Sequence, residues 1–527
     1  MNNDFKSKLD VHKNLQRFLY IRGYLLTNYQ SIDINKYPFY GNWNKIKIKN
    51  LYGYIHKDQQ YHIVNGHNFS ILMIGHAYNP FDMNYSENVI LNTLIEKLDK
   101  SNSDFIDYLN ELTGIFTLFI ISDNNLRIFT DCSSMQACYY GNINNNLYIT
   151  SHTQLVGDLC NLEFNSYIDN LIHYKHFRLY GVYLPSDLSI YEELKRVLPN
   201  TEVEYSNEKF FIKRFFPNKE LKMVPPDKYD DAILEIAKLM GNNMNLISKK
   251  WKKPAISLTG GTDSKTTLAC AIDDYDKFSY FSFISMPGEK IDAEAAHKIC
   301  DTIGLKHTIY NINPDKNNYP DFDMVKNILR MNLGNIGDSN ENDICKRIFL
   351  SNVDDFDVEI KSWVSEVARA NYYKKFGKKK FPKEVKSRYL SAMYKIFLEN
   401  KKLLKATDKV FEEYIEKTKL TEHLYNYDWT DIFLWEIRYG SWGGLVITSE
   451  HRYSNDITIP YNNRKILDLF LSLPLEKRID DIPHKDIVKV MNSKINETGI
   501  HIVNYNETKF RMYMEKMYYN FTTKFRS

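Results

Sequence analysis

The sequence predicts an α+β domain with antiparallel sheets, followed by an α/β domain with a parallel sheet and a largely helical C-terminal part. Short β-rich runs separated by turn residues occupy residues 69–151. Between residues 230 and 312 strand patterns alternate with helical ones, and after about residue 325 helical patterns dominate. A chain of 527 residues is long enough for two large domains, each with its own core.

The N-terminal half has the alternation of strands and turns that hairpins require. Asp123-Asn124-Asn125 and residues 142–146 are turn-formers between apolar runs. We expect antiparallel strands at residues 69–75, 114–122, 126–130 and 147–150. The prolines of Met223-Val224-Pro225-Pro226-Asp227 then predict a short stiff linker. We therefore place the domains at residues 1–222 and 223–527.

Beyond the linker the pattern is that of strands joined by helices. The segment 230–246 has apolar residues at helical spacing and is followed by the short apolar run 254–258. The same order repeats as helix 264–273, strand 278–285, helix 292–303 and strand 307–312. Right-handed crossovers between such strands give a parallel sheet.

Helix boundaries and core stripes follow from the same patterns. Asp292 is the expected N-cap of the helix 292–303, and Gly304 is its expected stop. One later helix has an apolar stripe that predicts core packing, formed by Leu390, Met393, Tyr394, Phe397 and Leu398.

Composition narrows the function classes. Hydrophobic residues make up 43% and charged residues 26%, as in ordinary globular proteins. The 69 Lys and Arg nearly balance the 66 Asp and Glu, so no nucleic-acid partner is expected. The polar start, Met1 to Lys6, contains no signal peptide or membrane span, which predicts a cytoplasmic protein without a membrane partner. Six scattered cysteines without a CxxC pair are expected to be reduced and mostly buried.

The loop from Ser257 to Lys265 is the segment most typical of a ligand-binding site. It runs from a buried strand into a helix, at the carboxyl edge of a parallel sheet where α/β folds bind ligands. Gly260 and Gly261 let backbone N–H groups approach an anion, and the following helix N-terminus adds partial positive charge. Asp263 would be unfavourable beside phosphate unless a cation is bound, which suggests Mg²⁺. The predicted ATP-binding residues are Ser257, Leu258, Thr259, Gly260, Gly261, Thr262, Asp263, Ser264, Lys265 and Ser285.

The loop Ser-Leu-Thr-Gly-Gly-Thr-Asp-Ser resembles the pyrophosphate loop of the ATP-pyrophosphatase superfamily. In the N-terminal half, residues 75–79 resemble the Gly-Glu-x-Tyr-Asn of asparagine synthetases, and residues 112–116 match their Leu-x-Gly-x-Phe. Residues 129–131 with 139–140 and residues 194–200 extend the resemblance, in order, over most of the chain. The resemblance is to the asparagine synthetase and β-lactam synthetase family. It implies an Ntn-hydrolase-like sandwich followed by an ATP-pyrophosphatase domain.

Departures from the family pattern are informative. Glutamine hydrolysis in this family needs a cysteine directly after the initiator Met, where this chain has Asn2. Thr130 replaces the Arg of the family's Arg-Asp pair. The resemblance therefore implies a glutaminase-like domain without glutaminase activity.

In the second half, the segment 360–373 stands where the family has Gly-x-Asp-Glu-x-x-Gly-Gly-Tyr. Glu366 aligns with the family's Glu, which implies a catalytic and metal-binding role beside Asp263. Arg369, one turn later, is a candidate ion-pair partner of Glu366 or contact for a substrate carboxylate. The exposed surface of a helix is the alternative place for Glu366.

Two later segments carry weaker predictions. Glu436 and Arg438 are charged residues among aromatics, and the two interpretations are a structural ion-pair network between them or a substrate site. Further on, relatives place a basic residue over the triphosphate, and Lys485 is the predicted catalytic equivalent, with His484 as the substitute.

The resemblance implies a ligase that uses ATP and Mg²⁺ to activate a carboxylate as its adenylate, which an amine then converts to an amide. The expected partners are small-molecule or peptide carboxylates and amines, and a homodimer is compatible with this class. Two alternatives remain open: base or sulfur chemistry on RNA, and a degenerate homologue retained as a scaffold or binding protein.

Overall fold

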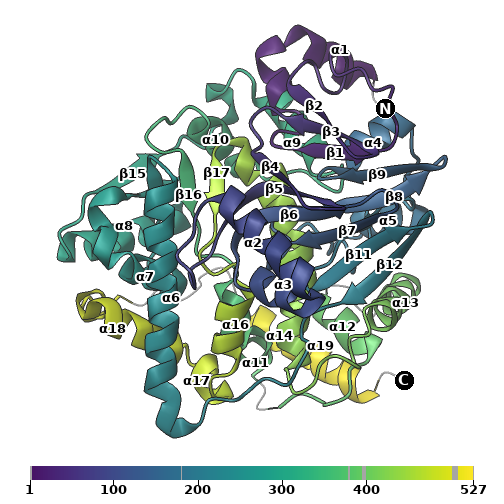
Figure 1. The fold of residues 1–527 in the computed structure, drawn as a ribbon. Coiled ribbons are helices and arrows are strands. Elements are labelled where there is room, and N and C mark those ends of the chain that lie inside the picture. The colour runs from purple at the N-terminus through teal and green to yellow at the C-terminus, as the bar shows by residue number, and fades with distance from the viewer. Residues whose placement is uncertain (1–2, 180, 378–379, 395–398, 501–508, 526–527) are drawn as a thin grey trace.

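The computed structural model describes residues 3–179, 181–377, 380–394, 399–500 and 509–525 (Figure 1). Two six-stranded antiparallel sheets form the N-terminal half, and a five-stranded parallel sheet lies in the second half. In Figure 1 the antiparallel sheets lie on the right, the parallel sheet on the left, and much of the helical C-terminal part below. The predicted classes of the two halves are therefore confirmed, whereas the boundary at residue 222 stays a prediction.

The two antiparallel sheets pack face to face as a sandwich. Leu26 and Ile55 of one sheet and Leu72 and Ile128 of the other belong to a single buried apolar cluster. The first sheet has the order β10 (Lys195–Arg196), β8 (Tyr139–Ile143), β9 (Asn146–Thr150), β1 (Tyr24–Thr27), β3 (Leu51–His56), β2 (Trp43–Ile48). The second has the order β12 (Lys209–Arg214), β11 (Thr201–Ser206), β7 (Asn125–Thr130), β6 (Thr113–Ile121), β5 (Ser70–Tyr78), β4 (Tyr61–Asn65).

The predicted hairpin turns are present in the sandwich. Asn144 and Asn145 join β8 to β9 with φ values of 50° and 62°, a left-handed pair that asparagine tolerates. The helices of this half are α1 (Asn3–Val11), α2 (Glu87–Lys100), α3 (Asn102–Leu109), α4 (Thr153–Cys160) and α5 (Ser166–Ile172), with a 3₁₀ helix at Lys13–Phe18. Figure 1 shows α2 and α3 covering the second sheet.

The parallel sheet has the order β15 (His307–Asn311), β14 (Ser279–Ile284), β13 (Pro254–Ser257), β16 (Val358–Ile360), β17 (Asp456–Thr458). Helices α6 (Tyr229–Lys250), α7 (Thr262–Cys270) and α8 (Pro287–Thr302) precede or connect the first three strands, as predicted. The sequence did not predict β16 and β17, because three residues are too few to show strand periodicity.

The predicted N-cap at Asp292 is wrong, whereas the stop at Gly304 is confirmed. Helix α8 begins five residues earlier, at Pro287, because proline at the first helical position has a φ that suits the helix and no N–H to leave unpaired. Gly304 follows the helix with φ of 76°, a conformation that glycine adopts without strain.

Helices dominate the rest of the chain, as expected. Leu390, Met393 and Tyr394 of the predicted stripe are buried, whereas Phe397 and Leu398 lie outside the described residues. The α-helices are α9 (Phe322–Asn332), α10 (Glu341–Leu350), α11 (Asn371–Phe376), α12 (Ser387–Tyr394), α13 (Lys401–Lys417), α14 (Trp429–Phe433), α15 (Gly444–Ser449), α16 (Arg464–Leu471), α17 (Leu475–Ile479), α18 (Ile482–Glu497) and α19 (Lys509–Phe525). A π-helix spans Leu434–Gly443, and 3₁₀ helices lie at Pro226–Lys228, Ile272–Lys277, Lys316–Asn318, Ser365–Arg369 and His451–Tyr453.

Two absences can be stated for the described part of the chain. No helix there is both long enough and apolar enough to cross a bilayer. The six cysteines are all free thiols, five of them buried, as the sequence predicted.

A buried ion pair joins the sandwich to the π-helix. Arg214 of β12 and Glu436 are both fully buried, and the guanidinium binds the carboxylate through two nitrogens. Tyr414 donates to Glu436 Oε2 at 2.6 Å and Asn200 to Oε1 at 3.1 Å. The predicted pairing of Glu436 with Arg438 is therefore wrong, because the partner of Glu436 comes from the other half of the chain.

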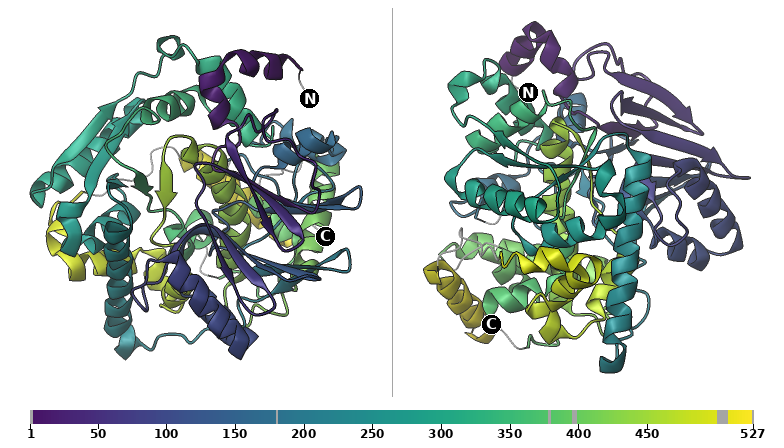
Figure 2. Two further views of the ribbon diagram at one scale, coloured as in Figure 1. Left: turned by 45° about the horizontal axis from the view of Figure 1, so that its top comes forward. Right: turned by 90° about the vertical axis from the view of Figure 1, so that its left-hand side faces the viewer.

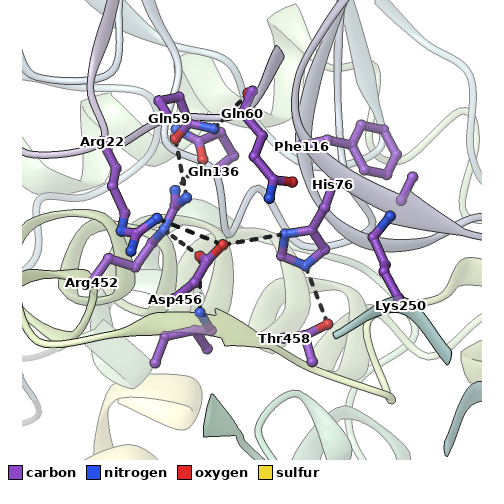
Figure 3. Close-up of polar contacts among 12 residues, drawn as sticks. Arg22, Gln59, Gln60, His76, Phe116, Gln136, Lys250, Arg452, Asp456 and Thr458 are labelled. Carbon is purple, nitrogen blue, oxygen red and sulfur yellow. Dashed lines mark hydrogen bonds and ion pairs between the residues drawn. The ribbon is translucent and has the colours of Figure 1, made fainter. Parts of the chain in front are cut away.

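A second polar cluster lies where the sandwich meets the edge of the parallel sheet (Figure 3). The carboxylate of Asp456 in β17 lies 3.1 Å from Arg452 Nε, 3.8 Å from Arg22 Nη1 and 4.0 Å from His76 Nδ1. A hydrogen bond of 3.2 Å joins His76 Nε2 to Thr458 Oγ1. Figure 2 shows the sandwich on one side of the parallel sheet, and these contacts attach it there.

Replacing Glu436 by Ala should lower the free energy of unfolding by about 3–5 kcal/mol, because Arg214 would remain buried without its counter-charge. Urea unfolding at neutral pH measures this loss. Glu413→Ala is the matched control, since that carboxylate is 58% exposed in a surface pair, and it should change stability by less than about 0.5 kcal/mol. Equal effects of the two substitutions would contradict the assignment.

Acidification between pH 6.5 and 4 should destabilise the fold partly through His76. Burial lowers the pKa of His76 to about 4, whereas an unfolded histidine has a pKa near 6.5. In this window the unfolded state binds more protons, so stability falls by up to about 1.4 kcal/mol per pH unit for this group. His76→Gln should reduce the slope of urea-unfolding stability against pH. His173→Gln, at an exposed position, is the control and should leave the slope unchanged.

Candidate functional site

The predicted loop joins strand to helix as expected. Strand β13 ends at Ser257, α7 begins at Thr262, and Gly261 is the N-cap with extended backbone at φ −73° and ψ 161°. Within the loop, Thr259 N–H donates to Ser264 Oγ at 3.0 Å. Gly261 N–H donates to Thr259 Oγ1 at 3.2 Å. These bonds hold the loop open at the carboxyl edge of the sheet.

A pocket of about 490 Å³ lies over this edge. One wall comes from β13, its loop and α7, through Ser257, Leu258, Thr259, Gly261, Asp263 and Ser264. The other wall comes from the segment after β16, the π-helix and the 3₁₀ helix His451–Tyr453, through Lys361, Ser362, Trp363, Ser365, Glu366, Arg438, Tyr439, Trp442 and His451. Side chains of β14 and α8 complete it: Ser282, Phe283, Glu289, Asp292 and Ala293.

The structure brings only part of the predicted set to this pocket. Seven predicted residues line it: Ser257, Leu258, Thr259, Gly261, Asp263, Ser264 and Glu366. Gly260 and Thr262 belong to the loop without lining the pocket, and Ser285 donates from N–H and Oγ to Glu289 Oε2, both at 2.8 Å.

The predicted basic residues are not in the lining. Lys265 Nζ donates to Ile500 O at 2.8 Å, and the exposed Lys485 donates to Asp480 O at 2.9 Å. The substitute, His484, lies nearer to the site, with Nε2 3.9 Å from Asp263 Oδ1. Helix α18 begins at Ile482, so consecutive residues face different directions.

Arg369 pairs with Asp263 and Asp481, not with Glu366. Its Nη1 lies 2.6 Å from Asp263 Oδ2, while Nε and Nη2 each lie 2.8 Å from an oxygen of Asp481. Lys374 also binds Asp481. Burial raises the pKa of the Asp481 carboxyl, but the hydrogen bonds and charge of Arg369 outweigh it and lower the pKa to about 2. The proposed metal ligand Asp263 thus already has a cationic partner.

The second oxygen of Asp263 has a different environment. Among the described residues, Oδ1 is buried without a hydrogen-bond partner, and so is the facing His484 Nε2. Burial lowers the pKa of His484 to about 3, so its imidazole is neutral at physiological pH. An unpaired carboxylate oxygen suits a cation or a water molecule at this point.

Asp292 is a site residue that the sequence analysis assigned differently. Its carboxylate Oδ1 accepts the Gly260 N–H at 3.2 Å, and its side chain lines the pocket. The Asp292 carboxylate of α8 therefore accepts a hydrogen bond from one of the loop N–H groups that were expected to bind phosphate. Burial raises the pKa of Asp292, so its charged form is unfavourable there.

Glu366 lies on the 3₁₀ helix Ser365–Arg369 and faces the pocket, not the exposed surface. Its Oε2 accepts a hydrogen bond of 2.9 Å from Tyr439 OH. Asp263 and Glu366 therefore line the same cavity.

The carboxylates that line the pocket suit magnesium only if the phosphate oxygens of a nucleotide complete its coordination. Across the ranges that the structure describes, no three His, Cys, Asp or Glu side chains gather as a metal site. Mg²⁺ in nucleotide sites commonly uses one or two carboxylates together with phosphate oxygens. The unpaired Asp263 Oδ1 and Glu366 suit that arrangement.

The motif residues of the N-terminal half have structural contacts. A Cβ at Gly75 would lie 2.1 Å from Ile115 O, so the close approach of β5 to β6 requires glycine there. Asp131 is fully buried and accepts from the N–H groups of Met135 and Gln136, both at 2.9 Å. Asn462 of the second half also donates to it at 2.8 Å. Asn2 lies outside the described residues.

Comparisons with known proteins give weak similarities. No family model and no curated protein matches the chain. Among solved structures, glutamine phosphoribosylpyrophosphate (PRPP) amidotransferase from B. subtilis, complexed with ADP and GMP, is 9% identical with a TM-score of 0.22. That match covers 51% of this chain and 61% of the other. These values are too low to assign a fold or a function.

Two further structures are similar at the same level. Glutamine-dependent NAD+ synthetase from Acinetobacter baumannii, in complex with ADP, is 12% identical with a TM-score of 0.20, over 62% of this chain and 83% of that one. An allosteric regulatory enzyme of purine biosynthesis is 10% identical with a TM-score of 0.24, over 58% and 62%. The resemblance to asparagine synthetases therefore stays a prediction from the sequence motifs.

Proposed function

We propose that this protein is an ATP-dependent ligase that forms an amide bond through an acyl-adenylate, without hydrolysing glutamine. The observation that carries the proposal is the shared pocket of Asp263 and Glu366. The glycine loop after β13 and the segment after β16 that carries Glu366 both line it. A glycine loop suited to phosphate and a carboxylate in the same pocket suit the two halves of a group-transfer reaction.

The proposed reaction has two steps. In the first, a substrate carboxylate oxygen attacks the α-phosphorus of ATP, the bond to the β-phosphate oxygen breaks, and pyrophosphate leaves. In the second, an amine nitrogen attacks the carbonyl carbon, the carbon–oxygen bond to phosphate breaks, and AMP leaves with the electron pair. The amine proton passes to a base. ATP and the two substrates supply every atom and electron in this sequence.

The chain's own groups have distinct tasks in this scheme. The N-terminus of α7 and the loop N–H groups would bind the phosphates, and Asp263 would hold the metal that accompanies them. That metal would supply charge neutralisation for the departing pyrophosphate. Glu366, which accepts a hydrogen bond from Tyr439, would accept the amine proton. Lys265 and Lys485 are not needed in this account.

The N-terminal sandwich is proposed to be structural. The Asp131 carboxylate accepts a backbone N–H of its own loop and a hydrogen bond from Asn462 of the second half. His76 of the sandwich contacts Thr458 of β17. We keep the division at residues 222 and 223, the lack of glutamine hydrolysis and the cytoplasmic location as parts of the proposal.

A second candidate is a scaffold or binding protein that has lost catalysis. The observation that favours it is internal neutralisation of the site: Arg369 pairs with Asp263, and Asp292 accepts the Gly260 N–H. ATP-dependent exchange of labelled pyrophosphate, in the presence of a panel of carboxylates, separates the candidates. The ligase should catalyse exchange with at least one carboxylate, and a scaffold should catalyse none.

Asp263→Ala should abolish pyrophosphate exchange, because the metal and the triphosphate would lose their protein carboxylate. Lys485→Met is the matched control, since this exposed lysine does not line the pocket, and exchange should remain within about twofold of the parent protein. Circular dichroism checks that both variants fold. Near-normal exchange by a folded Asp263→Ala protein would rule out the loop assignment.

Glu366→Gln should slow amide formation by at least about 10²-fold, the usual effect of removing a positioned acid or base. Pyrophosphate exchange should change much less, because the first step does not use this base. Single-turnover measurement of both steps, with Tyr439→Phe to test the supporting hydrogen bond, distinguishes the roles. Equal loss in both steps would instead assign Glu366 to metal or ATP binding.

A further inference from the structure

The pocket wall that includes the π-helix carries an aromatic surface. Trp363 and Trp442 both line the pocket, with ring centroids 5.1 Å apart and an angle of 17° between their planes. His451 packs edge-on against Trp363 at 5.2 Å. Both indoles are partly exposed, so the surface is accessible from the cavity. Flat aromatic groups of this kind bind planar rings by stacking.

The backbone fixes this surface in place. Trp442 lies on the ten-residue π-helix Leu434–Gly443, a rare conformation that often occurs at functional sites. A Cβ at Gly181 would lie 2.5 Å from Trp442 Nε1, so the Gly181 backbone, at φ of 98°, packs directly against the indole edge. The aromatic surface is therefore preorganised before any ligand binds.

Arg438 supplies a positive charge beside the aromatic surface. Its guanidinium carbon lies 5.4 Å from the Trp442 ring centroid. In the part of the chain that the structure describes, Arg438 makes no ion pair within 4.0 Å, and its buried Nε has no hydrogen-bond partner. Lys361, the other cation lining this pocket, binds Glu359 at 2.6 Å. Glu366 is the acid that interacts with Arg438 electrostatically, but it lies beyond 4.0 Å, so the guanidinium can still bind an anionic ligand directly.

We propose that Trp363, Trp442 and Arg438 form the subsite for a planar aromatic carboxylate, with the ring stacked on the indole pair and the carboxylate bound by Arg438. This assignment rests on the proposed ligase function and specifies its substrate class. Glu366 lies on the same wall, so a carboxylate held there is close to the proposed base.

The adenine ring of ATP is the competing occupant of this surface. Adenine is uncharged, whereas a carboxylate can accept two N–H hydrogen bonds from the guanidinium of Arg438. The loop side of the pocket also has apolar contacts for a nucleobase, through Leu258, Phe283 and Ala293. Charge matching therefore favours the aromatic acid at the Trp442 wall and the nucleotide at the loop.

Isothermal titration calorimetry without ATP tests the subsite with three probes. Indole-3-carboxylate is planar and anionic, cyclohexanecarboxylate is anionic but not flat, and indole-3-carboxamide is flat but neutral. Indole-3-carboxylate should bind at least about 10-fold more tightly than either of the others. Equal binding of the three probes would overturn the proposal.

Variants assign the binding to these residues. Arg438→Gln should remove the preference for indole-3-carboxylate over indole-3-carboxamide. Trp442→Leu should lower the affinity for both indole probes by about 10-fold. Trp442→Phe, which keeps a stacking face, should restore most of the affinity and guards against a misfolded Leu variant. Trp251→Leu is the control and should leave binding unchanged, because this indole packs edge-on against His76 and does not line the pocket. Loss of binding in the control to the same extent would overturn the assignment.

Competition with ATP separates this proposal from the ligase assignment. If a non-hydrolysable ATP analogue displaces indole-3-carboxylate, the aromatic surface is the nucleobase site and the proposal is wrong. If both bind together, the subsite assignment is supported. Absence of pyrophosphate exchange with a carboxylate that binds would count against the ligase function alone, because calorimetry measures the subsite without any reaction.

Discussion

The parallel pairing of β13 with β16 is the constraint on which the site depends. Because the two strands run in the same direction side by side, the segments that follow them leave the sheet at one edge. The glycine loop and the Glu366 segment, about one hundred residues apart in sequence, therefore line one pocket. The further pairing of β16 with β17 extends this edge toward the sandwich.

Buried polar contacts attach the sandwich to this sheet. The Arg214–Glu436 pair connects β12 to the π-helix that carries Arg438 and Trp442, and the Asp456 cluster connects β17 to β5 (Figure 3). Buried charges require well-placed partners, so each contact specifies one arrangement of the two halves. A sandwich without catalytic function would still be needed to hold the aromatic wall in position.

The site combines preorganised geometry with internally paired charges. Arg369 pairs with Asp263, and Asp292 accepts the Gly260 N–H. A nucleotide with its metal would have to compete for these groups, and its phosphates would offer Arg369 and the loop amides new partners. Arg438, by contrast, makes no ion pair within 4.0 Å among the described residues, although the charge of Glu366 acts on it, and its buried Nε has no hydrogen-bond partner.

The sequence alone determined the class of each half, four of the twelve strands of the sandwich (β5, β6, β7 and β9), the first three strands of the parallel sheet and the glycine loop between β13 and α7. These features depend on local periodicity and turn chemistry, which neighbouring residues carry. It also placed Glu366 among the site residues through its motif. The sequence did not predict β16 and β17, which are only three residues long and are stabilised by neighbouring strands in the sheet.

Only the tertiary structure decided which charges meet. Glu436 binds Arg214 across 222 residues of chain instead of the nearby Arg438, and Arg369 binds Asp263 and Asp481 instead of Glu366. Asp292 lies at the loop and not at a helix start, and Trp363 meets Trp442 because a π-helix turns the second indole into the pocket. Such pairings depend on how distant elements pack, and residue spacing along the chain contains no record of that packing.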